Sequence, residues 1–116
     1  MSVLKKLDIL SMGRLKTARV TVDGGEIIIS ELAAADSYSL FADKANQDEK
    51  GNLKMATFGP SLVARCVVDE DGGRLFADEE ASQLARLRPD LFGKLLVAAM
   101  DINGLSGQAQ DEAVKN

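Results

Sequence analysis

The chain has 116 residues, with 14 Lys and Arg against 18 Asp and Glu, no histidine and a single cysteine. This length predicts one domain that can bury a core without a disulfide, and the acidic pI of about 4.8 argues against a nucleic-acid binder. The lack of histidine excludes Ser-His-Asp and Cys-His catalysis and ordinary zinc sites, and no apolar run reaches the roughly 20 residues of a membrane helix.

The charged residues are unevenly distributed along the chain. Residues 1–22 carry five bases and one acid, whereas residues 23–116 carry 9 bases and 17 acids. The simpler interpretation is that both segments are solvated faces of one domain. The alternative is self-association, in which the basic N-terminal end of one copy meets an acidic face of another, because opposite potentials steer such encounters.

Residues 17–30 show the clearest strand pattern, because their first half alternates apolar and polar residues. Asp23-Gly24 predicts a hairpin turn, which requires positive φ angles. A run of three isoleucines then suits a second strand. An isolated hairpin is marginal in water, so we expect its apolar face to pack on helices or on a further strand from residues 3–12.

Residues 33–47 predict a helix, since they lack Gly and Pro and are rich in alanine. Apolar side chains recur within this segment at helical spacing. The stripe expected to be buried consists of Ala34, Tyr38, Phe41 and Ala45. The polar residues 46–54 that follow predict a loop.

A second helix is predicted over about 59–69. Gly59-Pro60 indicates its start, because proline is tolerated in the first turn of a helix. Cys66 lies on the apolar stripe of this helix, and no histidine is available to activate it. We therefore expect a buried structural thiol and not a nucleophile.

The acidic stretch 69–73 begins like a calcium-binding EF-hand loop, with acids at the first and third positions and Glu80 at the twelfth. The fifth and sixth positions are Gly73 and Arg74, so the required glycine is missing and a cation stands inside the loop. We therefore predict a tight turn between helices and no metal site. The sequence likewise predicts no catalytic residue and no cofactor.

The C-terminal third predicts two helices. Asp78 is the expected N-cap of a short helix. Pro89 starts a longer helix with a broad apolar face, and Asn103-Gly104 ends it, since the glycine can take a left-handed conformation.

Together these elements predict an α+β fold. A β-hairpin at about 17–30 would pack on a mostly helical body of about four helices. One domain would span residues 1–104, and residues 105–116 would form a flexible polar tail.

The order of these features is specific enough to name a family. ELAAAD at 31–36 starts a helix, ARCVVDEDGGRLF at 64–76 carries a helix into the acidic turn, and DINGLSG at 101–107 closes the last helix. Over residues 17–107 the chain resembles the tail assembly chaperones of long-tailed, non-contractile bacteriophages. It departs from the expected pattern at Ala33, where a capping Ser or Thr would stand.

The resemblance implies a non-enzymatic function in the cytoplasm of a bacterial host. Such chaperones bind the long, aggregation-prone tape measure protein while the tail is built. A longer form made by ribosomal frameshifting recruits tail tube subunits, and the chaperone is absent from the mature virion. The alternative is a small structural head–tail or tail component that is retained in the virion.

A chaperone of this kind would take apolar anchors of a helical client into a groove between its own helices. Large apolar residues near the acidic turn and near Pro89 either line this groove or belong to the core, and the sequence leaves both open. The candidate partner-binding residues are Leu75, Phe76, Leu84, Leu87, Leu91 and Phe92.

Overall fold

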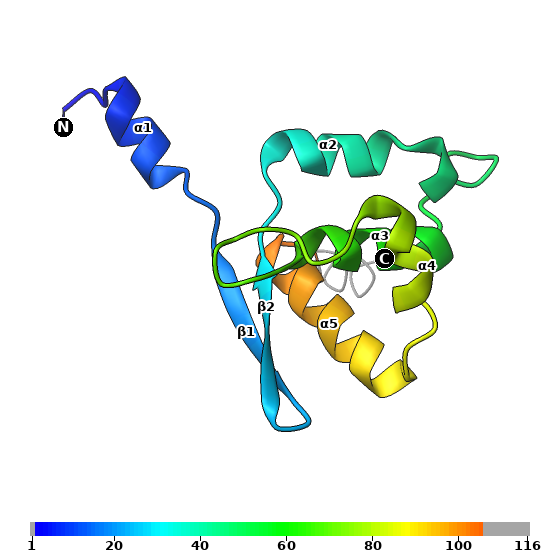
Figure 1. Cartoon of the computed structure of the whole chain (residues 1–116). Helices are drawn as coiled ribbons and strands as arrows, with labels where there is room; N and C mark the ends of the chain where they lie inside the picture. The colour runs from blue at the N-terminus through cyan, green and yellow to red at the C-terminus, as the bar shows by residue number, and fades with distance from the viewer. Residues whose placement is uncertain (1, 106–116) are drawn as a thin grey trace, which may run out of the picture.

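The computed structural model describes residues 2–105. It has a three-stranded antiparallel sheet in the order β1–β2–β3, with helices packed against it (Figure 1), which confirms the predicted α+β class. The strands are β1 (Thr17–Val22), β2 (Gly25–Ser30) and β3 (Val67–Val68). The helices are α1 (Lys6–Met12), α2 (Ala34–Ala42), α3 (Met55–Cys66), α4 (Ala81–Leu84) and α5 (Pro89–Ile102), with 3₁₀ turns η1 (Lys44–Asn46) and η2 (Asp78–Glu80).

The hairpin forms where the sequence predicts it. β1 and β2 pair along their whole length, with Thr17 opposite Ser30 at the open end. The turn residues Asp23 and Gly24 have φ angles of 37° and 84°. Both are positive, as the favoured two-residue hairpin turn requires.

A third strand extends the sheet where the helix was predicted to continue. Val67 and Val68 leave α3 and pair with Ile29 and Ile28 of β2. The free edge of β2 supplies backbone partners for these valines, and β-branched side chains suit a pleated surface. The predicted continuation of the helix to residue 69 is therefore wrong.

The start of α3 also differs from the prediction. The helix begins at Met55, so Pro60 lies inside it and not in its first turn. An internal proline costs about 3 kcal/mol. Phe58 is 1% exposed and Leu62 is fully buried in the same helix, and burying each contributes about 1.5–3 kcal/mol, which offsets this cost.

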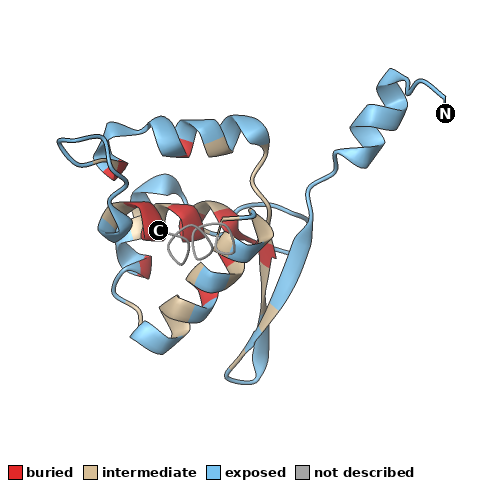
Figure 2. Cartoon of the chain, turned by 180° about the vertical axis from the view of Figure 1, so that it is seen from behind, coloured by how far each residue is buried: buried red, intermediate tan, exposed pale blue. Residues whose placement is uncertain are grey.

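Residues 3–12 form no further strand. Lys6–Met12 is the helix α1, which stands away from the body of the protein (Figures 1 and 2), and every residue in it is exposed. The carboxylate of Asp8 accepts a hydrogen bond from the backbone N–H of Lys5 at 2.9 Å, which caps the first turn.

The predicted helix 33–47 ends at Ala42, and the stripe expected to be buried is wrong. Tyr38 is 77% exposed, whereas Leu40 is 1% exposed. Leu40 belongs to the buried core with residues of α3, and its carbonyl accepts a hydrogen bond from the Asn46 side chain at 3.1 Å. Packing against α3, which the spacing of apolar residues does not reveal, selects the inner face of α2.

The predicted N-cap at Asp78 is also corrected. Ala77 occupies the N-cap position of η2, and its backbone N–H donates to the Glu80 carboxylate at 2.8 Å. By contrast, α5 starts at Pro89 as predicted, and Gly104 follows its end with a φ of 71°.

The core lies between the sheet and helices α2, α3, α4 and α5 (Figure 2). The side chain of Asn103 makes hydrogen bonds with three separate segments of the chain at this core. Its Oδ1 accepts the N–H of Leu32 at 2.9 Å, and its Nδ2 donates to the carbonyl of Ala99 at 2.7 Å and to Cys66 Sγ at 3.5 Å. The tail predicted from residue 105 lies outside the described residues, except for Leu105, which packs against the core.

Ala33 is the N-cap residue of α2 and has extended backbone angles but no capping side chain. We expect Ala33→Ser to raise the free energy of unfolding by about 1 kcal/mol, because the serine hydroxyl can accept a hydrogen bond from a backbone N–H of the first turn. Thermal denaturation followed by circular dichroism measures the change. Ala34→Ser, placed inside the helix, is the control; equal melting temperatures for the two variants would contradict the capping argument.

Candidate functional site

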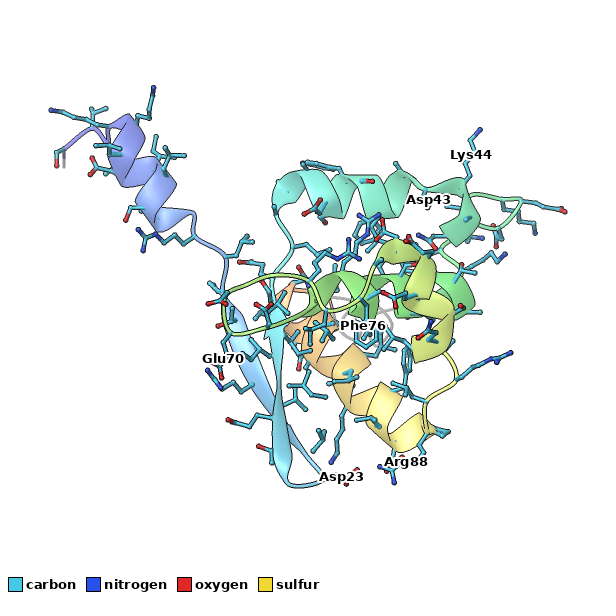
Figure 3. All side chains as sticks on the ribbon, viewed as in Figure 1. Asp23, Asp43, Lys44, Glu70, Phe76 and Arg88 are labelled. Carbon is cyan, nitrogen blue, oxygen red and sulfur yellow. The ribbon has the colours of Figure 1, made fainter. Side chains whose placement is uncertain are left out.

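An apolar groove of about 680 Å³ opens between the sheet and the helices α4 and α5. Figure 3 labels Phe76 among the helices, to the right of the two long strands in this view. Five of the six predicted partner-binding residues line the groove, so the fold brings these five together. They are Leu75, Phe76, Leu84, Leu87 and Leu91.

The acidic turn places Leu75 and Phe76 at the groove. Asp69 accepts backbone hydrogen bonds from Asp71 and Gly73 at 2.8 and 2.9 Å, so its carboxylate closes the turn. The chain then returns along β3, where the N–H of Leu75 donates to the carbonyl of Val67 at 3.2 Å. The turn therefore joins a short strand to a returning edge segment, and not two helices as predicted.

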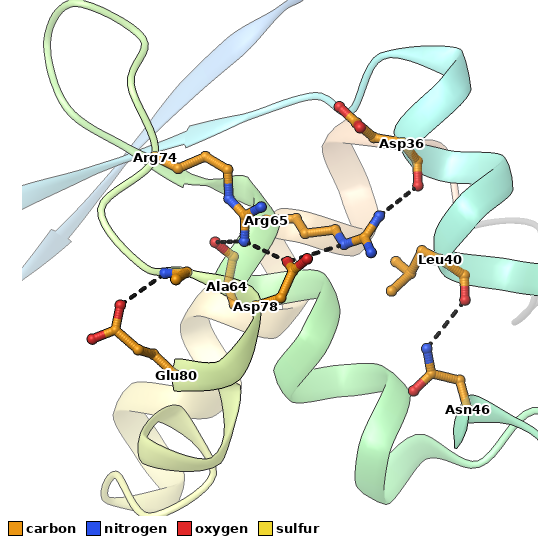
Figure 4. Close-up of polar contacts among 9 residues, drawn as sticks. Asp36, Leu40, Asn46, Ala64, Arg65, Arg74, Asp78 and Glu80 are labelled. Carbon is orange, nitrogen blue, oxygen red and sulfur yellow. Dashed lines mark hydrogen bonds and ion pairs between the residues drawn. The ribbon is translucent and has the colours of Figure 1, made fainter. Parts of the chain in front are cut away.

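An ion-pair network holds the segment after this turn against α3 (Figure 4). The Asp78 carboxylate lies 2.8 Å from Arg74 Nη2 and 3.6 Å from Arg65 Nε. Arg65 also donates to the carbonyl of Asp36 at 2.9 Å. The hydrogen bond from Arg74 and the positive charge of both arginines lower the pKa of Asp78, and the sequence pattern did not reveal this network.

The six predicted residues differ in how they are placed. Leu75 is 56% exposed, so it is available to a partner, whereas Leu84 is 2% exposed and belongs to the core. Phe76, Leu87 and Leu91 are half-buried. Phe92 does not line the groove; its ring packs near Gly59 of α3.

Sequence patterns did not reveal the side of the groove that the sheet provides. On this side Ile27 and Ile28 of β2 and Val67 of β3 line the groove. Leu95 of α5, which was not among the predicted residues, also lines it. The run of three isoleucines was the available signal, because a strand that is apolar on both faces has more than one surface to bury.

The charged side chains at the rim of the groove are mostly acidic. Glu26, Asp69 and Glu70 line it with a single base, Arg19. Arg19 Nη1 lies 3.4 Å from Glu26 Oε1, and neither Asp69 nor Glu70 takes part in an ion pair within residues 2–105. The groove therefore combines an apolar lining with a negative rim.

Cys66 lies outside the lining of the groove and is fully buried. Burial raises the pKa of its thiol to about 11, against a smaller opposing effect of the Asn103 hydrogen bond. The thiol is therefore protonated at neutral pH. Within residues 2–105, no three His, Cys, Asp or Glu side chains gather as a metal site would require.

None of the described helices combines the length and apolar composition needed to cross a membrane. Comparison of the chain with models of protein families, with curated proteins and with solved structures finds no match.

Proposed function

We propose that this chain is a tail assembly chaperone of a long-tailed, non-contractile bacteriophage, which binds the tape measure protein and holds it soluble while the tail is built. The observation that supports the proposal is the apolar groove beside β2, with its partly exposed Leu75. The sequence resemblance supplies the identity of the client. Binding is stoichiometric and needs no chemical step.

The lining favours an amphipathic helix as the bound segment. Leu75, Leu87 and Leu91 present branched apolar side chains from two sides of the groove, and a client helix would insert residues spaced three or four apart between them. A site for a small polar molecule usually has several polar groups that converge on the ligand. Here the charged side chains that line the groove are exposed, so they lie on its rim.

Tail tube subunits would be recruited by a longer, frameshifted form of the chaperone. Any such extension would follow α5 in the sequence, and Leu105, just after this helix, is the last residue that the structure describes. We place the chaperone in the cytoplasm of the bacterial host during tail assembly. It would leave before the virion is complete.

Co-expression with the tape measure protein of the same phage tests the proposal. We expect wild type to keep the tape measure protein soluble and to co-purify with it. Leu75→Asp should reduce the retained client at least about tenfold, because a carboxylate would have to be buried against apolar side chains. The amount of soluble tape measure protein at equal chaperone expression is the measurement.

Val97→Asp is the matched control, since Val97 is 57% exposed, as Leu75 is, but lies on α5 outside the lining of the groove. It should retain the client as wild type does. A tape measure protein that stays insoluble with wild type would contradict the proposal. Detection of the chain in purified particles would instead favour the alternative, a structural component of the virion.

A further inference from the structure

The N-terminal arm, residues 3–15, is rich in apolar residues and exposed along its whole length. Leu7 is 77% exposed and Leu10 is 64% exposed, and their spacing puts both on one face of α1. A helix of 7 residues is only marginally stable in water by itself. The arm therefore gains stability when this face is covered.

The base of the arm is fixed to the body of the protein. The N–H of Glu31 donates to the carbonyl of Lys16 at 2.8 Å, and the N–H of Lys16 donates to Glu31 Oε1 at 3.1 Å. The first of these bonds continues the backbone pairing of the hairpin one residue beyond Thr17 and Ser30, and the second adds a side-chain contact at the same place. From this anchor the arm runs outward (Figure 1), where a second molecule can meet it.

The charges of the arm and of the groove are complementary. The arm carries three bases and the single acid Asp8. The rim of the groove carries Asp69 and Glu70, which have no ion-pair partner within residues 2–105. Opposite potentials of this kind favour encounter between an arm and a groove and disfavour pairing of two arms.

We propose that the arm of one copy seats in the groove of a second copy. Leu7 and Leu10 enter the apolar lining beside Leu75, and Lys6 faces Glu70 on the rim. Docking covers the exposed leucines of both surfaces at once. This self-association requires no other protein, so it goes beyond the proposed function. Its corollary is that self-association competes with binding of the tape measure protein, and only this corollary rests on the proposed function.

Sedimentation velocity of the purified full chain over a wide range of concentration tests the proposal without any client. We expect the mass of wild type to rise from monomer to dimer or larger with concentration. Leu10→Asp should raise the dissociation constant at least about tenfold. Ile9→Asp is the matched control, because Ile9 is 58% exposed but lies on another face of α1, and it should associate as wild type does.

A mixing experiment separates arm from groove. Leu10→Asp keeps its groove and Leu75→Asp keeps its arm, so each should remain monomeric alone, whereas the mixture should form a 1:1 complex. Glu70→Lys is a second groove variant on an exposed side chain, and Lys6→Glu in the partner should restore the binding that it weakens. Circular dichroism confirms that each variant is folded.

Three outcomes would overturn the proposal. Wild type that stays monomeric at every concentration would show that the arm does not join two copies. Leu75→Asp that associates like wild type would place the arm against another surface. A mixture of the two monomeric variants that fails to combine would exclude arm-in-groove docking.

Discussion

Leu84→Ala should lower the free energy of unfolding by about 2–5 kcal/mol, the usual cost of removing a buried leucine side chain. Leu84 is 2% exposed and belongs to the core, although one side of it also lines the groove. The surrounding helices are tied into the fold, so they cannot collapse fully into the space left behind. Chemical denaturation at neutral pH measures the loss.

Leu75→Ala is the matched control for this prediction. Leu75 lines the same groove but is 56% exposed, so its truncation should change stability by no more than about 0.5 kcal/mol. The two variants separate the residues that build the groove from those that remain free to bind. Equal losses would show that Leu75 is part of the core and would remove the basis for its role in binding.

Stability should also fall at alkaline pH because of Cys66. Burial raises the thiol pKa in the folded protein to about 11 from the value of 9.0 expected in the unfolded chain. As pH rises, the thiol ionises first in the unfolded chain, which favours unfolding. The stability contributed by the raised pKa is therefore fully present below pH 9 and is lost as pH rises through the pKa of the folded protein. By pH 11 the loss amounts to about 2 kcal/mol.

Cys66→Ala isolates this contribution. The variant will be less stable than wild type at pH 7, because it leaves a small cavity beside Asn103. Between pH 8.5 and 11, its free energy of unfolding should nevertheless fall by about 2 kcal/mol less than that of wild type. The two proteins differ only at residue 66, so the difference between the two pH profiles reports on the thiol. Parallel profiles would contradict its raised pKa.

Several elements could be predicted from the sequence because their determinants are local. Asp23-Gly24 takes the two positive φ angles that a tight hairpin needs. The helix from Pro89 has a strong apolar face and ends at a glycine in the left-handed conformation. Five of the six candidate partner-binding residues also lie along one groove, whereas their role in binding stays a prediction.

Other features depend on contacts between distant segments, and the sequence predicted them wrongly or not at all. Val67 and Val68 become a strand because the edge of β2 is free to pair with them. The inner face of α2 is set by Leu40 against α3, and Tyr38 points to solvent instead. Apolar spacing indicates that a helix has a buried face, but it cannot specify which neighbour covers that face.

The sequence by itself determined the α+β class, the hairpin, the last helix and the separation of a basic N-terminal end from an acidic remainder. Only the tertiary structure decided which leucines are core and which are exposed in the groove, since burial depends on every element packed around a residue. It also placed the bases Lys5, Lys6 and Arg14 on an arm that stands apart from the body, and put Asp69 and Glu70 at the groove. Charge along a chain is additive and can be counted, whereas the surfaces that face one another are fixed only when the chain has folded.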